Sequence, residues 1–142
     1  MDKNKKYEIP IGLKFPLQRG THGYFDQNFT TVDQTVDNIK NLLLTSIGHR
    51  RLNIGFGSKL MSFFFEQISS EENFTDDLSS YIRDLILSHF PRIDILDLEL
   101  NFSEENTNRL NIKLEIKLKS LSKYSLQTND KKTLNLTMDI LN

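Results

Sequence analysis

The sequence predicts an α+β fold, with about three N-terminal helices packed on a C-terminal three-stranded antiparallel sheet. Between about residues 32 and 90, apolar residues recur every three or four positions, which is the spacing of a helix face. After residue 91, apolar and polar residues alternate, which is typical of strands with one buried face. The 142 residues fit one domain with an apolar core.

The first 31 residues show no sustained period, and we expect an extended arm over 1–31 before a single α+β domain over 32–142. Pro10 and Pro16 fix their own φ angles and push the preceding residues away from helix. The arm is rich in aromatic residues, which indicates packing on its own domain or on a neighbouring protein. These residues are Phe15, Tyr24, Phe25 and Phe29.

We expect the first helix to begin at residues 31–33, where Thr and Asp oxygens can cap it, and to end at Gly48. A second helix over 58–66 is apolar nearly all round, which predicts an interior position. The third should begin at Thr75 and stop at Pro91. Its expected buried stripe is Leu78, Ile82, Leu85, Ile86 and Phe90.

Three segments then alternate as half-buried strands, joined by polar loops over 103–108 and 122–132. Their expected core residues are Leu96, Leu98, Leu100 and Phe102; Leu110, Ile112, Leu114, Ile116 and Leu118; and Leu134, Leu136, Met138 and Ile140. Lys113, Lys117 and Lys119 would form a basic row on the opposite face, either solvated or facing an acidic partner.

Composition argues against several classes of function. The net charge of −1 gives no general attraction to nucleic acid or to an anionic membrane. Cysteine is absent, which excludes a disulfide framework or a thiolate metal site. His22, His49 and His89 lie in separate segments without metal-ligand spacing, so we expect no metal and no cofactor. No signal peptide or membrane-spanning run is visible, so we expect folding in the cytoplasm.

The most informative block, 38–67, carries Gly48-His49-Arg50, then Gly55-Phe56-Gly57, then Phe65-Glu66. The glycines permit positive φ or close backbone approach, and Phe56 would anchor the turn in the core. Further on, Phe90-Pro91-Arg92-Ile93 joins the last helix to the sheet. Arginines at such junctions can bind several carbonyls or one carboxylate.

In their order and spacing, these motifs resemble the gene-25-like baseplate wedge family of contractile phage tails, which includes the corresponding component of type VI secretion. The resemblance covers about residues 15–118. His49 and Phe90 stand where the family has glutamate, and Ile54 stands where it has proline. An ion pair of Arg50 or Arg92 would then need another carboxylate, such as Glu66 or Asp94, or a partner protein.

The resemblance implies a structural subunit, not an enzyme, that binds larger wedge proteins and templates the first sheath ring by strand pairing. It implies no nucleic-acid or membrane partner, assembly in the host cytoplasm and a final place in the virion tail baseplate. The third strand, over 133–141, would be the template or an ordinary sheet edge. The interface candidates are Arg50, Phe56, Gly57, Glu66, Pro91, Arg92, Ile93, Leu136 and Met138.

Two alternatives remain open. The baseplate could belong to type VI secretion or to an extracellular contractile injection system. A cell-wall lysozyme is the alternative of another class, and it needs two carboxyl groups about 5–10 Å apart. Pairs such as Glu66 with Glu71 or Glu72 can be named, but the family glutamates that could have served are His49 and Phe90 here.

Overall fold

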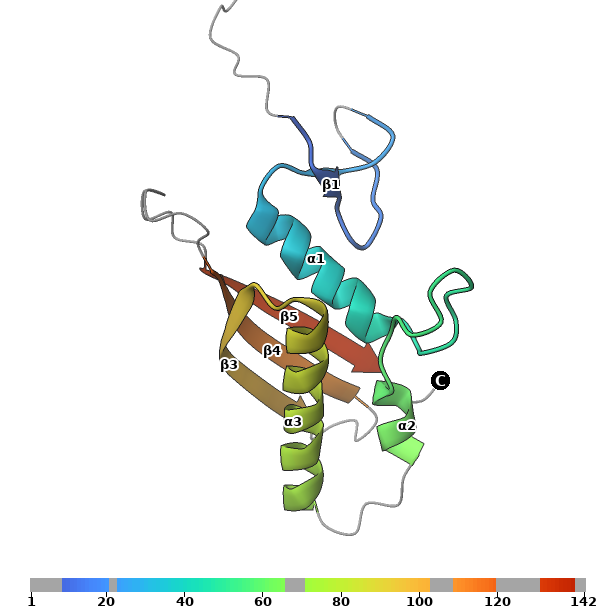
Figure 1. Ribbon diagram of the computed structural model, residues 1–142, viewed down its shortest axis with the longest axis vertical. Helices are drawn as coiled ribbons and strands as arrows, with labels where there is room; N and C mark the ends of the chain where they lie inside the picture. The colour runs from blue at the N-terminus through green and yellow to red at the C-terminus, as the bar shows by residue number, and fades with distance from the viewer. Residues whose placement is uncertain (1–8, 21–22, 66–70, 103–108, 120–130, 140–142) are drawn as a thin grey trace, which may run out of the picture.

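Helices lie on one face of a three-stranded sheet, and a small hairpin lies beyond the first helix (Figure 1). A computed structural model describes residues 9–20, 23–65, 71–102, 109–119 and 131–139. The predicted α+β class and the C-terminal antiparallel sheet, of strand order β3-β4-β5, are confirmed. The described ranges contain three helices, but these are not at the N-terminus as predicted, because a two-stranded sheet precedes them.

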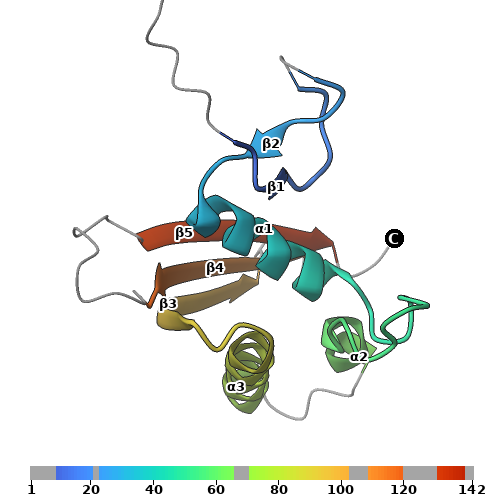
Figure 2. The same cartoon turned by 45° about the horizontal axis from the view of Figure 1, so that its top comes forward.

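The sheet consists of β3 (Ile93–Phe102), β4 (Arg109–Leu118) and β5 (Lys131–Asp139). The central strand, β4, alternates as its sequence predicts, because every second side chain faces the helices. These core side chains are Leu110, Ile112, Leu114 and Ile116. Helix α1 lies beside β5, and α3 lies beside β3 (Figure 2), so both helices cover the same apolar face.

A β-bulge in β3 corrects the predicted alternation of that strand. The register with β4 shifts between Ile95 and Asp97, so one extra residue is accommodated there. Leu96 therefore leaves the core and is 43% exposed, although its strand position predicted burial. Ile93 and Ile95 pack on the core before the bulge, and Leu98 packs there after it.

Helix α1 (Thr31–Leu44) begins one residue after its cap, Thr30. The Thr30 hydroxyl accepts the Asp33 amide at 3.1 Å, so the predicted cap at 31–33 is wrong by one residue. The predicted end at Gly48 is also wrong, because the helix ends at Leu44 with Thr45 as its C-cap. Gly48, with φ of +88°, lies in the turn that follows.

The other two helices differ from expectation at their starts. Helix α2 (Leu60–Phe65) buries Leu60 but exposes Met61 and Ser62, so it is not interior all round. Helix α3 (Glu71–His89) begins four residues before the predicted Thr75. Its stripe is confirmed: Leu78, Ile82 and Ile86 are fully buried, and Leu85 and Phe90 pack on them partly buried.

The N-terminal arm folds back on itself. Strand β1 (Gly12–Leu13) pairs antiparallel with β2 (Gln27–Asn28), so residues 9–20 and 23–29 form the two sides of a hairpin, called the hairpin arm below. Whether 32–142 is a separate domain stays a prediction. Glu66, the 103–108 loop and most of the 122–132 connection lie outside the described residues.

Candidate assembly surface

The connection between α1 and α2, residues 45–59, is tied closely to the domain and is called the 45–59 loop below. The Ser58 amide donates to the Thr45 carbonyl at 2.7 Å, and the Ile47 amide donates to the Ser58 carbonyl at 3.2 Å. Gly57 has φ of +130°, and a Cβ there would lie 2.6 Å from the Thr45 oxygen. Only glycine therefore fits where the two ends of the loop cross.

Phe56 and Arg50 connect this loop to the end of α3. The Arg50 guanidinium carbon lies 4.6 Å from the centre of the Phe56 ring, within cation–π range. The other contact of this ring is edge-to-face with His89, at 5.9 Å between centroids. Phe56 is partly buried and anchors the loop as predicted, but on His89 instead of within the core cluster.

The turn between α3 and β3 presents Arg92 to solvent. Ile93 is buried in the core, whereas Pro91 and Arg92 are exposed. Asp94, suggested by the sequence as a partner of Arg92, pairs instead with Lys119 at 3.2 Å. Among the residues that the structure describes, no carboxylate forms an ion pair with Arg92.

A pocket of about 560 Å³ opens beside this turn. Its wall combines residues 30–32 and Thr35 at the start of α1, residues 89–93 around the turn, and residues 118–119 at the end of β4. His89, Arg92 and Lys119 supply its basic groups, and its lining contains no Asp or Glu. The pocket can therefore accept an apolar group with a negatively charged neighbour.

Strand β5 is an edge strand, because it pairs with β4 on one side and the sheet order ends with it. Met138 is in the core cluster, and Leu136 packs against that cluster. These two predicted interface residues thus face inward, and the strand offers its backbone at the other edge. The smaller pocket, of about 200 Å³, separates β5 from the hairpin arm and α1.

The predicted basic row on β4 is largely neutralised within the sheet. Lys113 pairs with Glu99 at 2.9 Å, and Lys119 pairs with Asp94. The hydrogen bond from Lys113 to Glu99 raises the pKa of this lysine. Two of the three lysines of the row are therefore in cross-strand ion pairs, which weakens the case for an acidic partner on this face.

Sequence reasoning missed a buried carboxylate that holds the hairpin arm. Asp37 of α1 is only 6% exposed. It accepts the Asn28 side-chain amide at 2.7 Å, the Phe15 backbone amide at 3.1 Å and the Lys40 ammonium at 3.2 Å. A signal did exist, because Asp37 stands beside Val36 on the buried side of the helix.

The arm itself exposes its apolar side chains. Tyr24 is 92% exposed, and Phe25 and Phe29 are about half exposed, so of the expected aromatic packing only Phe15 is partly buried. Within the described ranges, no cluster of acidic or histidine side chains could hold a metal ion. Within the same ranges, no helix combines the length and the apolar character that crossing a membrane requires.

Comparisons with known proteins agree on one family and one fold. The model of the family described as Baseplate wedge protein gp25 matches residues 32–122, so the hairpin arm and β5 lie outside the match. No curated protein matches the sequence.

Two solved structures share the fold. A candidate tail lysozyme from Geobacter sulfurreducens superimposes with a TM-score of 0.61 at 16% identity, over 80% of this chain and 94% of that one. A chain of the anti-feeding prophage baseplate, determined by cryo-EM, gives 0.61 at 19% identity, over 78% and 86%.

Proposed function

This chain belongs to the Baseplate wedge protein gp25 family, and we propose from this premise that it is a structural wedge subunit of a contractile tail. In this role it binds larger wedge proteins and templates the first ring of sheath. The observation that carries the proposal is Arg92, exposed beside an acid-free pocket within the matched residues.

Wedge binding is assigned to Arg92 on geometric grounds. A guanidinium group binds a carboxylate through two parallel hydrogen bonds, and this one has no such partner among the described residues. The neighbouring apolar wall of the pocket would exclude water from the contact. An exposed arginine at the rim of an apolar pocket is the kind of residue that dominates binding energy at interfaces.

The test is Arg92→Ala, with Lys117→Ala as a matched loss of one exposed cation on the far face of the sheet. We expect Arg92→Ala to melt at the wild-type temperature but to fail in wedge assembly, measured by co-purification with the wedge proteins. The control should assemble normally. Normal assembly of Arg92→Ala, or a folding defect as its sole effect, counts against the proposal.

Sheath templating is assigned to the free edge of β5. An edge strand offers unpaired amides and carbonyls to an incoming strand, and the inward side chains of β5 already have their place in the core. Deleting the strand would also remove Leu134 and Met138 from that core, so a deletion cannot separate templating from folding.

Hydrogen exchange can distinguish sheath templating by β5 from its role in folding. When sheath subunits are added, the β5 amides that point away from β4 should gain protection, while those already bonded to β4 should change little. Unchanged exchange along the whole of β5 in the presence of growing sheath would exclude this strand as the template.

The kind of particle is a second question. This chain shares its fold with a chain of the anti-feeding prophage baseplate. An extracellular injection device is therefore the second candidate particle, after a phage tail. Type VI secretion is the third candidate. We propose the phage virion, reached after assembly in the host cytoplasm. Quantitative mass spectrometry of purified particles tests this: a copy number far below sheath and tube, in a particle that also carries a head, supports the phage reading.

A hydrolase is the competing class of protein, because the similar Geobacter structure is described as a candidate tail lysozyme. The larger pocket has no carboxylate in its lining. In the smaller pocket, Asp33 forms an ion pair with Lys132 and Asp37 forms one with Lys40. We propose no cell-wall hydrolysis and no cofactor. Clearing of a cell-wall suspension by the purified chain would refute this.

A further inference from the structure

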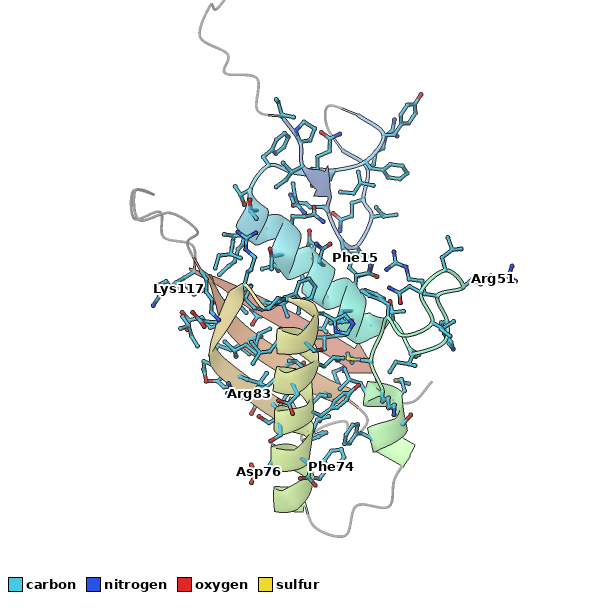
Figure 3. All side chains as sticks on the ribbon, in the orientation of Figure 1. Phe15, Arg51, Phe74, Asp76, Arg83 and Lys117 are labelled. Atoms are coloured by element: carbon cyan, nitrogen blue, oxygen red, sulfur yellow. The ribbon has the colours of Figure 1, made fainter. Side chains whose placement is uncertain are left out.

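The 45–59 loop carries an apolar tip that none of the other described elements covers. Leu52 is fully exposed, and Ile54 is 69% exposed. Figure 3 shows Arg51 at the outer end of this loop, directed away from the domain. Ile47, nearer the base of the loop, is also exposed. The outer part of the loop thus exposes Leu52 and Ile54 close in sequence to Arg51.

This loop carries cations that form no ion pair with an acidic residue in the part of the chain that the structure describes. Arg50, Arg51 and Lys59 are all exposed, and His49 lies beside them. The sequence contains no Asp or Glu anywhere over 38–65, although the whole chain has 19 acidic residues. The lysines of the sheet face differ, because Asp94 and Glu99 pair with two of them.

The loop is held in one conformation. Beyond the ties at Ser58, the Gly48 amide donates to the Ile54 carbonyl at 3.0 Å, and the Phe56 amide donates to the Asn53 carbonyl at 3.0 Å. Gly57 closes its base, and Phe56 packs on His89. A preordered loop loses little conformational entropy when it binds, which raises the affinity its exposed apolar groups can provide.

We propose that the 45–59 loop docks into an apolar groove rimmed by carboxylates on a neighbouring protein of the assembly. This inference rests on the proposed function only in requiring an assembled baseplate, and it uses neither Arg92 nor β5. The apolar side chains of the loop would fill the groove, and the cations Arg50, Arg51 and Lys59 would select a partner of opposite charge. Nucleic acid fits less well, because stacking needs free rings and Arg50 already covers Phe56.

The absence of cysteine makes a direct test possible. Full-length chains carrying Leu52→Cys or, as control, Lys117→Cys are labelled with maleimide, free and within purified particles. Because the core of a protein interface excludes solvent, the Leu52→Cys rate should fall at least about tenfold on assembly while the control rate holds. A Leu52→Cys rate that is unchanged, or that falls no more than the control rate, overturns the proposal.

A photoreactive group on the same Leu52→Cys position identifies the partner. Cross-links to a protein segment rich in Asp and Glu support the proposal, whereas adducts with lipid, with nucleic acid or with an acid-poor surface overturn it. Arg51→Glu should reduce incorporation into particles, and Arg51→Lys should restore it, with Lys117→Glu as the charge-matched control.

The two proposals fail in different ways. Particles that lack the wild-type chain altogether would overturn the proposed function and this inference together. Particles that contain it, with Leu52→Cys still freely labelled, would overturn the loop docking alone.

Discussion

The hairpin arm and the sheet domain use apolar side chains in opposite ways. In the domain, residues such as Ile39, Leu78 and Leu114 are fully buried and make up a shared core. In the arm, Tyr24 and its apolar neighbours face solvent, and the attachment depends on the buried carboxylate of Asp37. The domain therefore owes its stability to the hydrophobic effect, whereas the arm owes its position to a few hydrogen bonds.

This difference indicates which region stabilises the fold and which is available to bind a partner. Apolar groups that stay in water do not stabilise the fold, but they gain free energy when a partner covers them. The arm also lies outside the family match at 32–122. Substitutions in the domain should consequently reduce its folding stability, whereas substitutions in the arm should affect how the arm is attached to the domain.

The largest effect is expected from Leu114→Ala in the central strand. Loss of a fully buried leucine side chain leaves a cavity and should lower the free energy of unfolding by about 2–5 kcal/mol. The control, Leu17→Ala in the exposed arm, should change it by less than about 0.5 kcal/mol. Denaturant unfolding measures both, and equal losses would contradict the contrast between the two regions.

Gly57→Ala should come next, because it tests whether the 45–59 loop belongs with the rigid domain. A Cβ at φ of +130° and 2.6 Å from the Thr45 oxygen forces the backbone to move, at a cost of about 1–3 kcal/mol. Gly55→Ala is the control, since the nearest atom to a Cβ there is 3.9 Å away. If thermal melting shows equal effects for the two variants, the loop is not closed as described.

Asp37→Ala should release the arm while the domain stays folded. It removes the acceptor of the Phe15 amide and the nearest acceptor of the Asn28 side-chain amide, which also donates to Leu13 and Gln34, a loss of about 1–2 kcal/mol. Backbone hydrogen exchange should quicken in residues 9–29 and hold steady in β4. Asp37→Asn, which keeps an acceptor oxygen, should release the arm less. Cooperative unfolding of β4 together with the arm would show that the two regions are not separable.

Much of the fold followed from local periodicity. Alternation in β4 and the stripe of α3 were predictable because each reflects burial on one face. The bulge at Leu96 was not, because an extra residue in a strand leaves no local pattern and depends on the partner strand. The role of Asp37 depends likewise on Asn28 and Phe15, which only the folded hairpin brings to it.

The candidate site divides in the same way. Arg92 and the glycine turn were recognisable because their residue types fit a junction, and Gly57 does adopt positive φ. The inward direction of Met138 followed from the alternation of its strand, whereas the ion pairs of the β4 lysines were not foreseen, because they depend on the register between β3 and β4. The sequence pattern shows residue types, but it does not show which residues pair across strands that are far apart in the chain.

The smallest effect should come from the Lys14–Asp26 ion pair across the arm, at 2.9 Å. The hydrogen bond from Lys14 lowers the pKa of Asp26, and the bond to Asp26 raises the pKa of Lys14. The contribution of Asp26 is present above its unfolded pKa, about 4, and is lost as pH falls through its lowered folded pKa. That of Lys14 is present below its unfolded pKa, about 10.4, and is lost as pH rises through its raised folded pKa.

The pair should therefore hold the arm's two sides together between about pH 4 and pH 10. NMR titration should place the Asp26 midpoint below its ordinary value, and Lys14→Gln should bring it part of the way back, because the Gln27 amide still donates to this carboxylate. Both groups lie at the surface, so the melting temperature of the domain should not follow this titration. A domain whose melting tracked Asp26 would mean that the arm and the core are coupled more tightly than one buried carboxylate allows.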